Sequence, residues 1–150
     1  LSEYFFGRSV SVNPDEMKAI VSYRLERAAE SLQAAEIMRQ NGMLTFAMNR
    51  VYYAMFYAVQ SLLITGNAAF SKHGQVKGHF NRAFIKTEIF PINMGRIYNR
   101  AFEYRQKFDY LDFAQPDEET VRQFINHARE FVSVIQSYLG EKIPGTMPDK

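Results

Sequence analysis

The side chain best suited to chemistry in this sequence is Arg105, which lies at the edge of an apolar helical stripe and away from the solvent face of its helix. A guanidinium in that position needs a partner, and its planar fork of donors suits a phosphate or a carboxylate. Asp109, four residues later, could supply the partner through an ordinary helical salt bridge. Arg105 is therefore a candidate anion-binding residue, and a purely structural pair with Asp109 is the alternative.

A second set of polar side chains follows one arc of the apolar segment 49–63, namely Asn49, Arg50, Tyr53, Tyr57 and Gln60. The rest of this segment is apolar enough to be surrounded by protein, and a buried polar group without a partner costs roughly 1–3 kcal/mol. These side chains are therefore expected to face a site, a subunit interface or another polar helix. A buried network that fixes the register of the helix is the alternative.

Most enzyme templates are missing from the sequence. It has no cysteine, no glycine-rich phosphate loop, no His-Glu-x-x-His, no serine elbow and no spacing of His with Asp or Glu that suits a metal. We therefore expect no metal and no cofactor. Lys72 and His73 precede a predicted helix, where His73 is either a structural hydrogen-bonding residue or, with Lys72, a source of positive charge for a groove.

The elements that must position these residues are helical. Apolar side chains recur with helical spacing in five segments, and nothing alternates with the period of a strand for long enough. Asn13 and Pro14 are typical of a helix start, and Asn41-Gly42 of a helix end. The helices are expected at about 15–40, 44–65, 75–87 and 93–113, with a fifth that Pro116 opens.

The sequence thus predicts an all-α fold, a compact bundle of about five helices with up-down packing of the long ones. Its 150 residues, 47% of them hydrophobic, suffice for one domain. We expect an N-terminal arm at 1–14, the bundle at 15–140 and a C-terminal tail at 141–150. The longest apolar run is far shorter than a membrane span needs, and no secretion signal is evident, so we expect a cytoplasmic protein. A net charge of +2 does not by itself indicate nucleic acid.

Four stretches, taken in order, resemble the successive motifs of the HEPN-domain family. They are Asn49-Arg50-x-Tyr52-Tyr53-Ala54-x-Phe56-Tyr57-Ala58, Lys72-His73-Gly74-x-Val76 with Phe80, Phe84-Ile85-Lys86-Thr87, and Arg105-Gln-Lys-Phe-Asp109-Tyr110. The resemblance covers about 15–139. It is closest to the small stand-alone prokaryotic branch, in which Arg-x3-Asp-Tyr takes the place of Arg-x4-6-His.

This resemblance implies a helical bundle that forms a homodimer and, in many relatives, acts on RNA as a metal-independent endoribonuclease. Prokaryotic members often serve as toxins beside a small nucleotidyltransferase antitoxin. The resemblance places the catalytic positions at Arg105, Asp109 and Tyr110. RNA or another ligand would contact the remaining site residues, Asn49, Arg50, Tyr53, Lys72 and His73.

The motif histidine of active relatives is missing, because positions 110–112 are Tyr, Leu and Asp. Histidine passes protons near neutral pH because its pKa is about 6.5, whereas that of Tyr is about 10 and that of Asp about 3.9. We therefore expect the ribonuclease reaction to be lost and a binding or partner role to remain, with retained catalysis as an alternative. A further alternative is a nucleotide-binding bundle in which Tyr53, Tyr57 and Arg105 line one pocket.

A second match to the active motif, Arg122 with His127, is discounted. These two side chains point about 140° apart on a regular helix.

Overall fold

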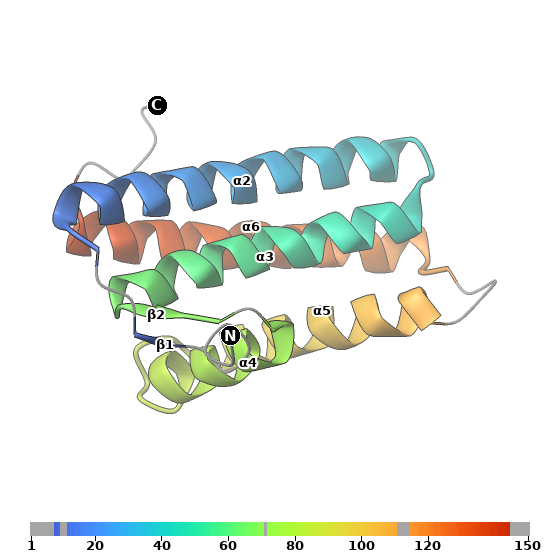
Figure 1. The fold of residues 1–150 in the computed structure, drawn as a ribbon. Helices are drawn as coiled ribbons and strands as arrows, with labels where there is room; N and C mark the ends of the chain where they lie inside the picture. The colour runs from blue at the N-terminus through green and yellow to red at the C-terminus, as the bar shows by residue number, and fades with distance from the viewer. Residues whose placement is uncertain (1–7, 10–11, 71, 111–114, 145–150) are drawn as a thin grey trace.

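The computed structural model describes residues 8–9, 12–70, 72–110 and 115–144, and the fold is an all-α bundle as predicted (Figure 1). Its helices in the described part are α2 (Pro14–Gln40), α3 (Leu44–Thr65), α4 (His73–Phe80), α5 (Ile92–Tyr110) and α6 (Glu118–Lys142). A π-helical turn, η1 (Asn81–Ile85), continues α4. None of the described helices has the combination of length and apolar character that crossing a bilayer requires.

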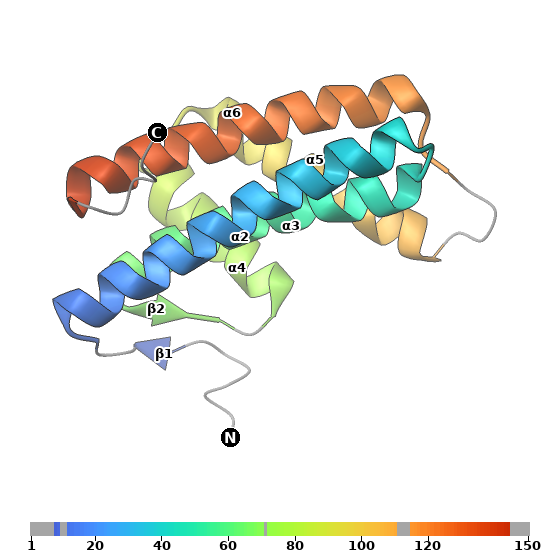
Figure 2. The same cartoon turned by 90° about the horizontal axis from the view of Figure 1, so that it is seen from above.

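The helix α3 is the centre of the bundle. Figure 1 shows it between α2 and α5, and Figure 2 shows α2 crossing close to it when the molecule is seen from above. The helix also packs on α6. The side chains of Val51, Met55 and Leu62 are fully buried there, and each such burial stabilises the fold by about 1.5–3 kcal/mol. The predicted core helix is thus confirmed.

Both ends of α2 follow the local signals in the sequence. Oδ1 of Asn13 accepts a hydrogen bond of 2.8 Å from the backbone N–H of Glu16, and Pro14 is the first helical residue. At the other end Gly42 has a φ of +73°, the left-handed conformation that favours glycine. The short turn that follows makes α2 and α3 an antiparallel pair.

A two-residue antiparallel strand pair was not predicted. Arg8 in β1 (Arg8–Ser9) lies opposite Ala69 in β2 (Ala68–Ala69). Such a short pair carries no sequence period, because alternation over four or more residues is needed to indicate a strand. Residues 1–7 and 10–11, the rest of the predicted arm apart from 12–14, lie outside the described residues.

The third helix differs from its predicted range of 75–87. The helix α4 begins two residues earlier, at His73, and passes into η1 at Asn81. Opposite this turn lies Gly95 of α5, where a Cβ atom would come 2.9 Å from Oδ1 of Asn81 and 3.2 Å from Ile85. The amide nitrogen of Asn81 also donates to Oδ1 of Asn99 at 3.1 Å. The π-helical turn η1 thus lies where α5 packs closely on it, and helix propensity alone does not predict such a turn.

The last helix was predicted to open at Pro116 and to end before a tail at 141–150. It is capped instead by Asp117, whose Oδ1 accepts from the backbone N–H of Thr120 at 2.8 Å. The helix continues past Gly140 to Lys142, because the buried side chain of Leu139 and the half-buried Ile143 pack on the core. Residues 145–150 of the predicted tail, like residues 111–113 of the predicted fourth helix, lie outside the described residues.

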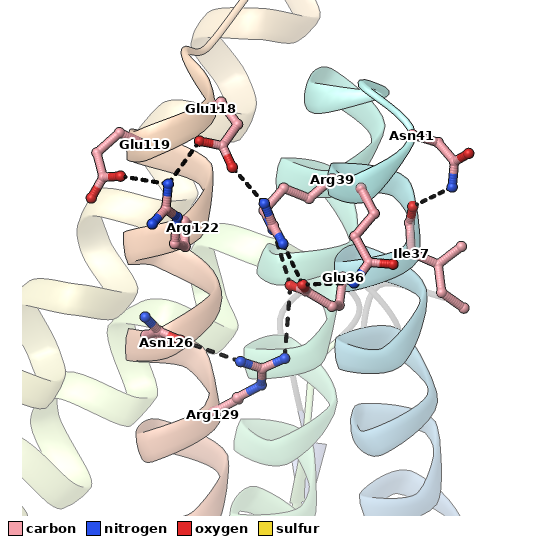
Figure 3. A network of polar contacts seen from close by, with 10 residues as sticks. Glu36, Ile37, Arg39, Asn41, Glu118, Glu119, Arg122, Asn126 and Arg129 are labelled. Atoms are coloured by element: carbon pink, nitrogen blue, oxygen red, sulfur yellow. Dashed lines mark hydrogen bonds and ion pairs between the residues drawn. The ribbon is translucent and has the colours of Figure 1, made fainter.

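An ion-pair network joins α2 to α6 at the end of the bundle near the α2–α3 turn (Figure 3). The guanidinium of Arg39 contacts Glu36 on its own helix at 2.5 Å and Glu118 at the start of α6. Arg129 lies 3.8 Å from Glu36, and Arg122 lies 3.0 Å from Glu118. The network holds the first turn of α6 against the last turn of α2.

Candidate functional site

The half-buried side chain of Arg105 points from α5 toward α3. Its Cζ atom lies 5.0 Å from the ring centre of Tyr52 and 5.4 Å from that of Tyr53. A guanidinium at this distance from an aromatic ring is attracted to its face. The placement matches the position at the edge of the core that was predicted for Arg105. The side chains of Asp109 and Tyr110, in the last turn of α5, lie outside what the structure describes.

His73 lies against the same tyrosines although it comes from a different element. Its Nδ1 atom is 2.7 Å from the hydroxyl of Tyr52, and its ring stacks on Phe56 with the ring centres 4.3 Å apart. The ring centres of His73 and Tyr53 are 5.7 Å apart at nearly perpendicular planes. The start of α4 thus places an imidazole in the cluster that Arg105 enters from α5.

The surroundings keep the imidazole of His73 and the hydroxyl of Tyr52 uncharged near neutral pH. Burial lowers the pKa of His73, and the positive charge of Arg105 lowers it further. Burial likewise raises the pKa of Tyr52 well above its usual value. A protonated Tyr52 hydroxyl can donate to Nδ1 of His73, and the imidazole then carries its own hydrogen on Nε2. In that arrangement His73 offers a donor to a bound anion.

Tyr53 connects this cluster to the polar arc of α3. The Cζ atom of Arg50 lies 4.9 Å from the ring centre of Tyr53, so two guanidiniums, those of Arg50 and Arg105, pack on one tyrosine. The ring of Tyr57 follows one helical turn later, 6.1 Å from that of Tyr53. The side chains of this arc are therefore half-buried, a degree of exposure that is compatible with an interface or a binding site.

The structure brings together four of the predicted site residues, Arg105, Arg50, Tyr53 and His73. Asn49 is half-buried on α3 one residue before Arg50, and Lys72 is exposed at the N-cap of α4. Arg122, from the discounted motif match, pairs with Glu118 on the surface of α6. The ring of His127 packs near Phe124, with ring centres 6.4 Å apart.

Sequence reasoning missed the part that Tyr52 plays. The sequence offered it only as one position of the first motif, and its side chain is fully buried. The missed signal is that a buried tyrosine, unlike a phenylalanine, carries a hydroxyl that needs a partner. The partner, His73, is 21 residues away in the sequence, so no local spacing would have identified it.

The two relevant hollows of the surface differ in size and position. A hollow of about 170 Å³ lies between α2 and α3 and is lined in part by Arg27, Arg50 and Tyr57. It is smaller than the roughly 300–1,000 Å³ of ordinary small-molecule pockets. Its lining includes Tyr57 but neither Tyr53 nor Arg105, so the nucleotide pocket lined by Tyr53, Tyr57 and Arg105 stays a prediction. A hollow of about 720 Å³ lies elsewhere, where residues near the start of α2 and the end of α6 meet. Within the described ranges, no three side chains of His, Asp or Glu gather as metal ligands would.

Comparison with known proteins gives a consistent family match. The model of the HEPN domain matches residues 21–138. A "UPF0332 protein" of Thermotoga maritima is 38% identical over 125 residues, which cover 83% of this chain and 95% of that protein. Two proteins of Methanocaldococcus jannaschii, "Putative toxin MJ0142" and "Putative toxin MJ0605", are 32% and 33% identical, over 79% and 85% of this chain and 80% and 91% of their own lengths.

Proposed function

Since this chain belongs to the HEPN-domain family, in its small stand-alone prokaryotic branch, we propose that it is an RNA-directed, toxin-like protein whose Arg105 holds an RNA phosphate. Two of its relatives carry the word toxin in their names, which supports the toxin-like part of the proposal. The observation that carries the RNA part is the packing of two guanidiniums, those of Arg105 and Arg50, on the ring of Tyr53.

The chemistry of this cluster suits a ribonucleotide. A guanidinium presents two parallel N–H donors that match two phosphate oxygens. The half-buried ring of Tyr53 packs against both cations, and its accessible part offers an aromatic surface to a base. His73, kept neutral by burial and by the charge of Arg105, which lower its pKa, adds a hydrogen-bond donor at the same place.

Binding, and not cleavage, is the core of the proposal. The sequence has no histidine at 110–112, where the active motif of the family places one. If the protein does cleave RNA, the reaction is metal-independent, and Asp109 and Tyr110 are the candidate groups beside Arg105. Because the usual pKa values of Asp and Tyr are about 3.9 and 10, either group would need a strong shift to transfer protons at neutral pH.

The proposed partners follow from the family. We expect a homodimer, and we expect a small nucleotidyltransferase to act as the antitoxin in the cytoplasm. A role as a non-catalytic interaction module that serves such a nucleotidyltransferase is the second candidate. The missing motif histidine favours it. Stable copurification of a nucleotidyltransferase together with undetectable RNA binding would favour the second candidate over the first.

Replacement of Arg105 tests the proposal. The Arg105→Ala variant should lose RNA binding and growth inhibition while its helical circular dichroism spectrum stays that of the natural protein. Arg96→Ala is the matched control. Arg96 is an exposed arginine of the same helix, nine residues away, and so on its opposite side. Unchanged RNA binding and growth inhibition in Arg105→Ala would remove the assignment of this site.

A further inference from the structure

A row of side chains extends from Arg105 across α3. Arg50, Tyr53 and Tyr57 are spaced three and four residues apart, so they share one face of α3. The contacts are continuous, because Tyr53 packs against Arg105, Arg50 and Tyr57. All of these side chains are half-buried, so their outer surfaces remain accessible.

The row continues onto α2, which runs beside α3 on the side away from α5 (Figure 1). Arg27 lines the 170 Å³ hollow together with Arg50 and Tyr57. The Cζ atom of Arg27 in turn lies 5.7 Å from the ring centre of Tyr23, whose surface is 58% exposed. Three arginines and three tyrosines from three helices thus form one band, which we call the tyrosine–arginine strip: Arg105, Tyr53, Arg50, Tyr57, Arg27 and Tyr23.

The strip carries an excess of positive charge. Glu30 also lines the hollow and pairs with Arg27 at 2.8 Å, but both of these side chains are about half exposed, so solvent weakens the pair. Arg50 beside them makes no ion pair within the residues that the structure describes, so the hollow between α2 and α3 keeps a positive charge. A second copy of the chain that docked the same strip on itself would bring like charges together, so the strip suits a polyanion better than a self-association.

We propose that the tyrosine–arginine strip is a track for single-stranded RNA, an inference that rests on the proposed function of the Arg105 site. Successive bases stack on Tyr53, Tyr57 and Tyr23, and the phosphates between them meet the guanidiniums. The unpaired strand is the form that fits, because the bases of a duplex are stacked on one another and withheld from the tyrosines. A strand that lies along a surface needs no enclosed pocket, which agrees with the small volume of the hollow.

The test measures the affinity of a labelled random single-stranded RNA octamer by fluorescence anisotropy. Tyr23→Ala should weaken binding by about fivefold to a hundredfold, the loss expected for one base–aromatic stack. Tyr23→Phe keeps a stacking face and should bind like the natural protein. Arg27→Gln should weaken binding and make the logarithmic salt dependence shallower by about 0.7. Arg96→Ala should change neither quantity.

Four other results would each overturn a stated part of the proposal. If Arg105→Ala loses binding while Tyr23→Ala and Arg27→Gln behave like Arg96→Ala, the track is wrong and the Arg105 site stands. If the natural protein does not bind the octamer, the proposed function fails with it. Equal affinity for a duplex of the same length would overturn the single-strand assignment. A reduced solution mass of Tyr23→Ala would show that the strip is an interface between copies and overturn the track.

Discussion

The hydroxyl of Tyr52 lies 2.7 Å from Nδ1 of His73, and this contact joins the central helix α3 to the first residue of α4. The tyrosine is fully buried, and its ring also lies under the guanidinium of Arg105. One residue of the core therefore fixes the imidazole and touches the cation of the candidate site. Any change at Tyr52 should affect the site and the stability of the fold together.

Replacing Tyr52 by Phe should destabilise the protein by about 0.5–1.5 kcal/mol, because it removes the hydrogen bond to His73 while keeping the ring. The free energy of unfolding in urea measures the loss. Tyr23→Phe is the control. The side chain of Tyr23 is 58% exposed, so water can bond to its hydroxyl in the folded and the unfolded state, and removal of that hydroxyl should cost little. Equal losses in the two variants would contradict the importance of the contact.

The protein should lose stability as the pH is lowered, because His73 then takes up a proton. Burial and the charge of Arg105 lower the pKa of His73 in the folded state, whereas the unfolded value is about 6.5. The unfolded state therefore binds the proton more readily. The contribution of this residue is fully present above about pH 6.5 and is lost as the pH falls from there through the folded pKa. Urea unfolding at a series of pH values measures it.

His73→Gln is the control for this prediction. It should flatten the pH dependence only in part, because burial and Arg82 also lower the pKa of His79. A second check uses nuclear magnetic resonance to follow the His73 ring in Arg105→Met. The side chains packed on His73 from α3 are the rings of Tyr52, Tyr53 and Phe56. With the positive charge of Arg105 removed, the pKa of His73 should rise, and an unchanged pKa would contradict the electrostatic account.

Gly95→Ala should destabilise the protein by about 1–3 kcal/mol, the usual cost of an extra group in a filled core. The new Cβ would come 2.9 Å from Oδ1 of Asn81 and 3.2 Å from Cγ1 of Ile85, so these two side chains would have to shift from their present packing between η1 and α5. Thermal unfolding measures the effect. Gly74→Ala is the matched control, since its Cβ would meet no atom within 4 Å and should be tolerated. A Gly95→Ala protein as stable as Gly74→Ala would refute the close approach.

Arg39→Ala should lower the urea midpoint because it removes the link from α2 to the first turn of α6. Arg39 contacts Glu36 and Glu118, and only 19% of its side chain is exposed. The difference from the natural protein should shrink in high salt, since ions screen the charges that remain. Arg27→Ala removes a half-exposed pair within a single helix and should lower the midpoint less. The reverse order of the two variants would show that the link between α2 and α6 adds nothing.

The sequence alone determined the long helices and several of their ends. Local features, set by neighbours a few residues away, include the cap at Asn13 and the left-handed Gly42, which mark the two ends of α2. The apolar period of α3 is another, and the predicted bounds of that helix agree with the structure. The helical period of α5 likewise predicted that Arg105 lies at the edge of its apolar stripe. Local signals were weaker where packing against another element sets the backbone geometry or the end of a helix. Examples are the π-helical turn η1 opposite Gly95 and the end of α6.

Only the tertiary structure decided which of these side chains meet. His73 lies in the cluster because α4 starts against α3, and the partners Tyr52 and Arg105 are far from it in the sequence. The strip likewise depends on how α2 is rotated beside α3, which places Arg27 at the same hollow as Arg50 and Tyr57. Helical period specifies the face on which a residue lies, but the packing of whole helices specifies what that face contacts. For that reason the sequence identified Arg105 as a candidate, and the fold supplied its surroundings.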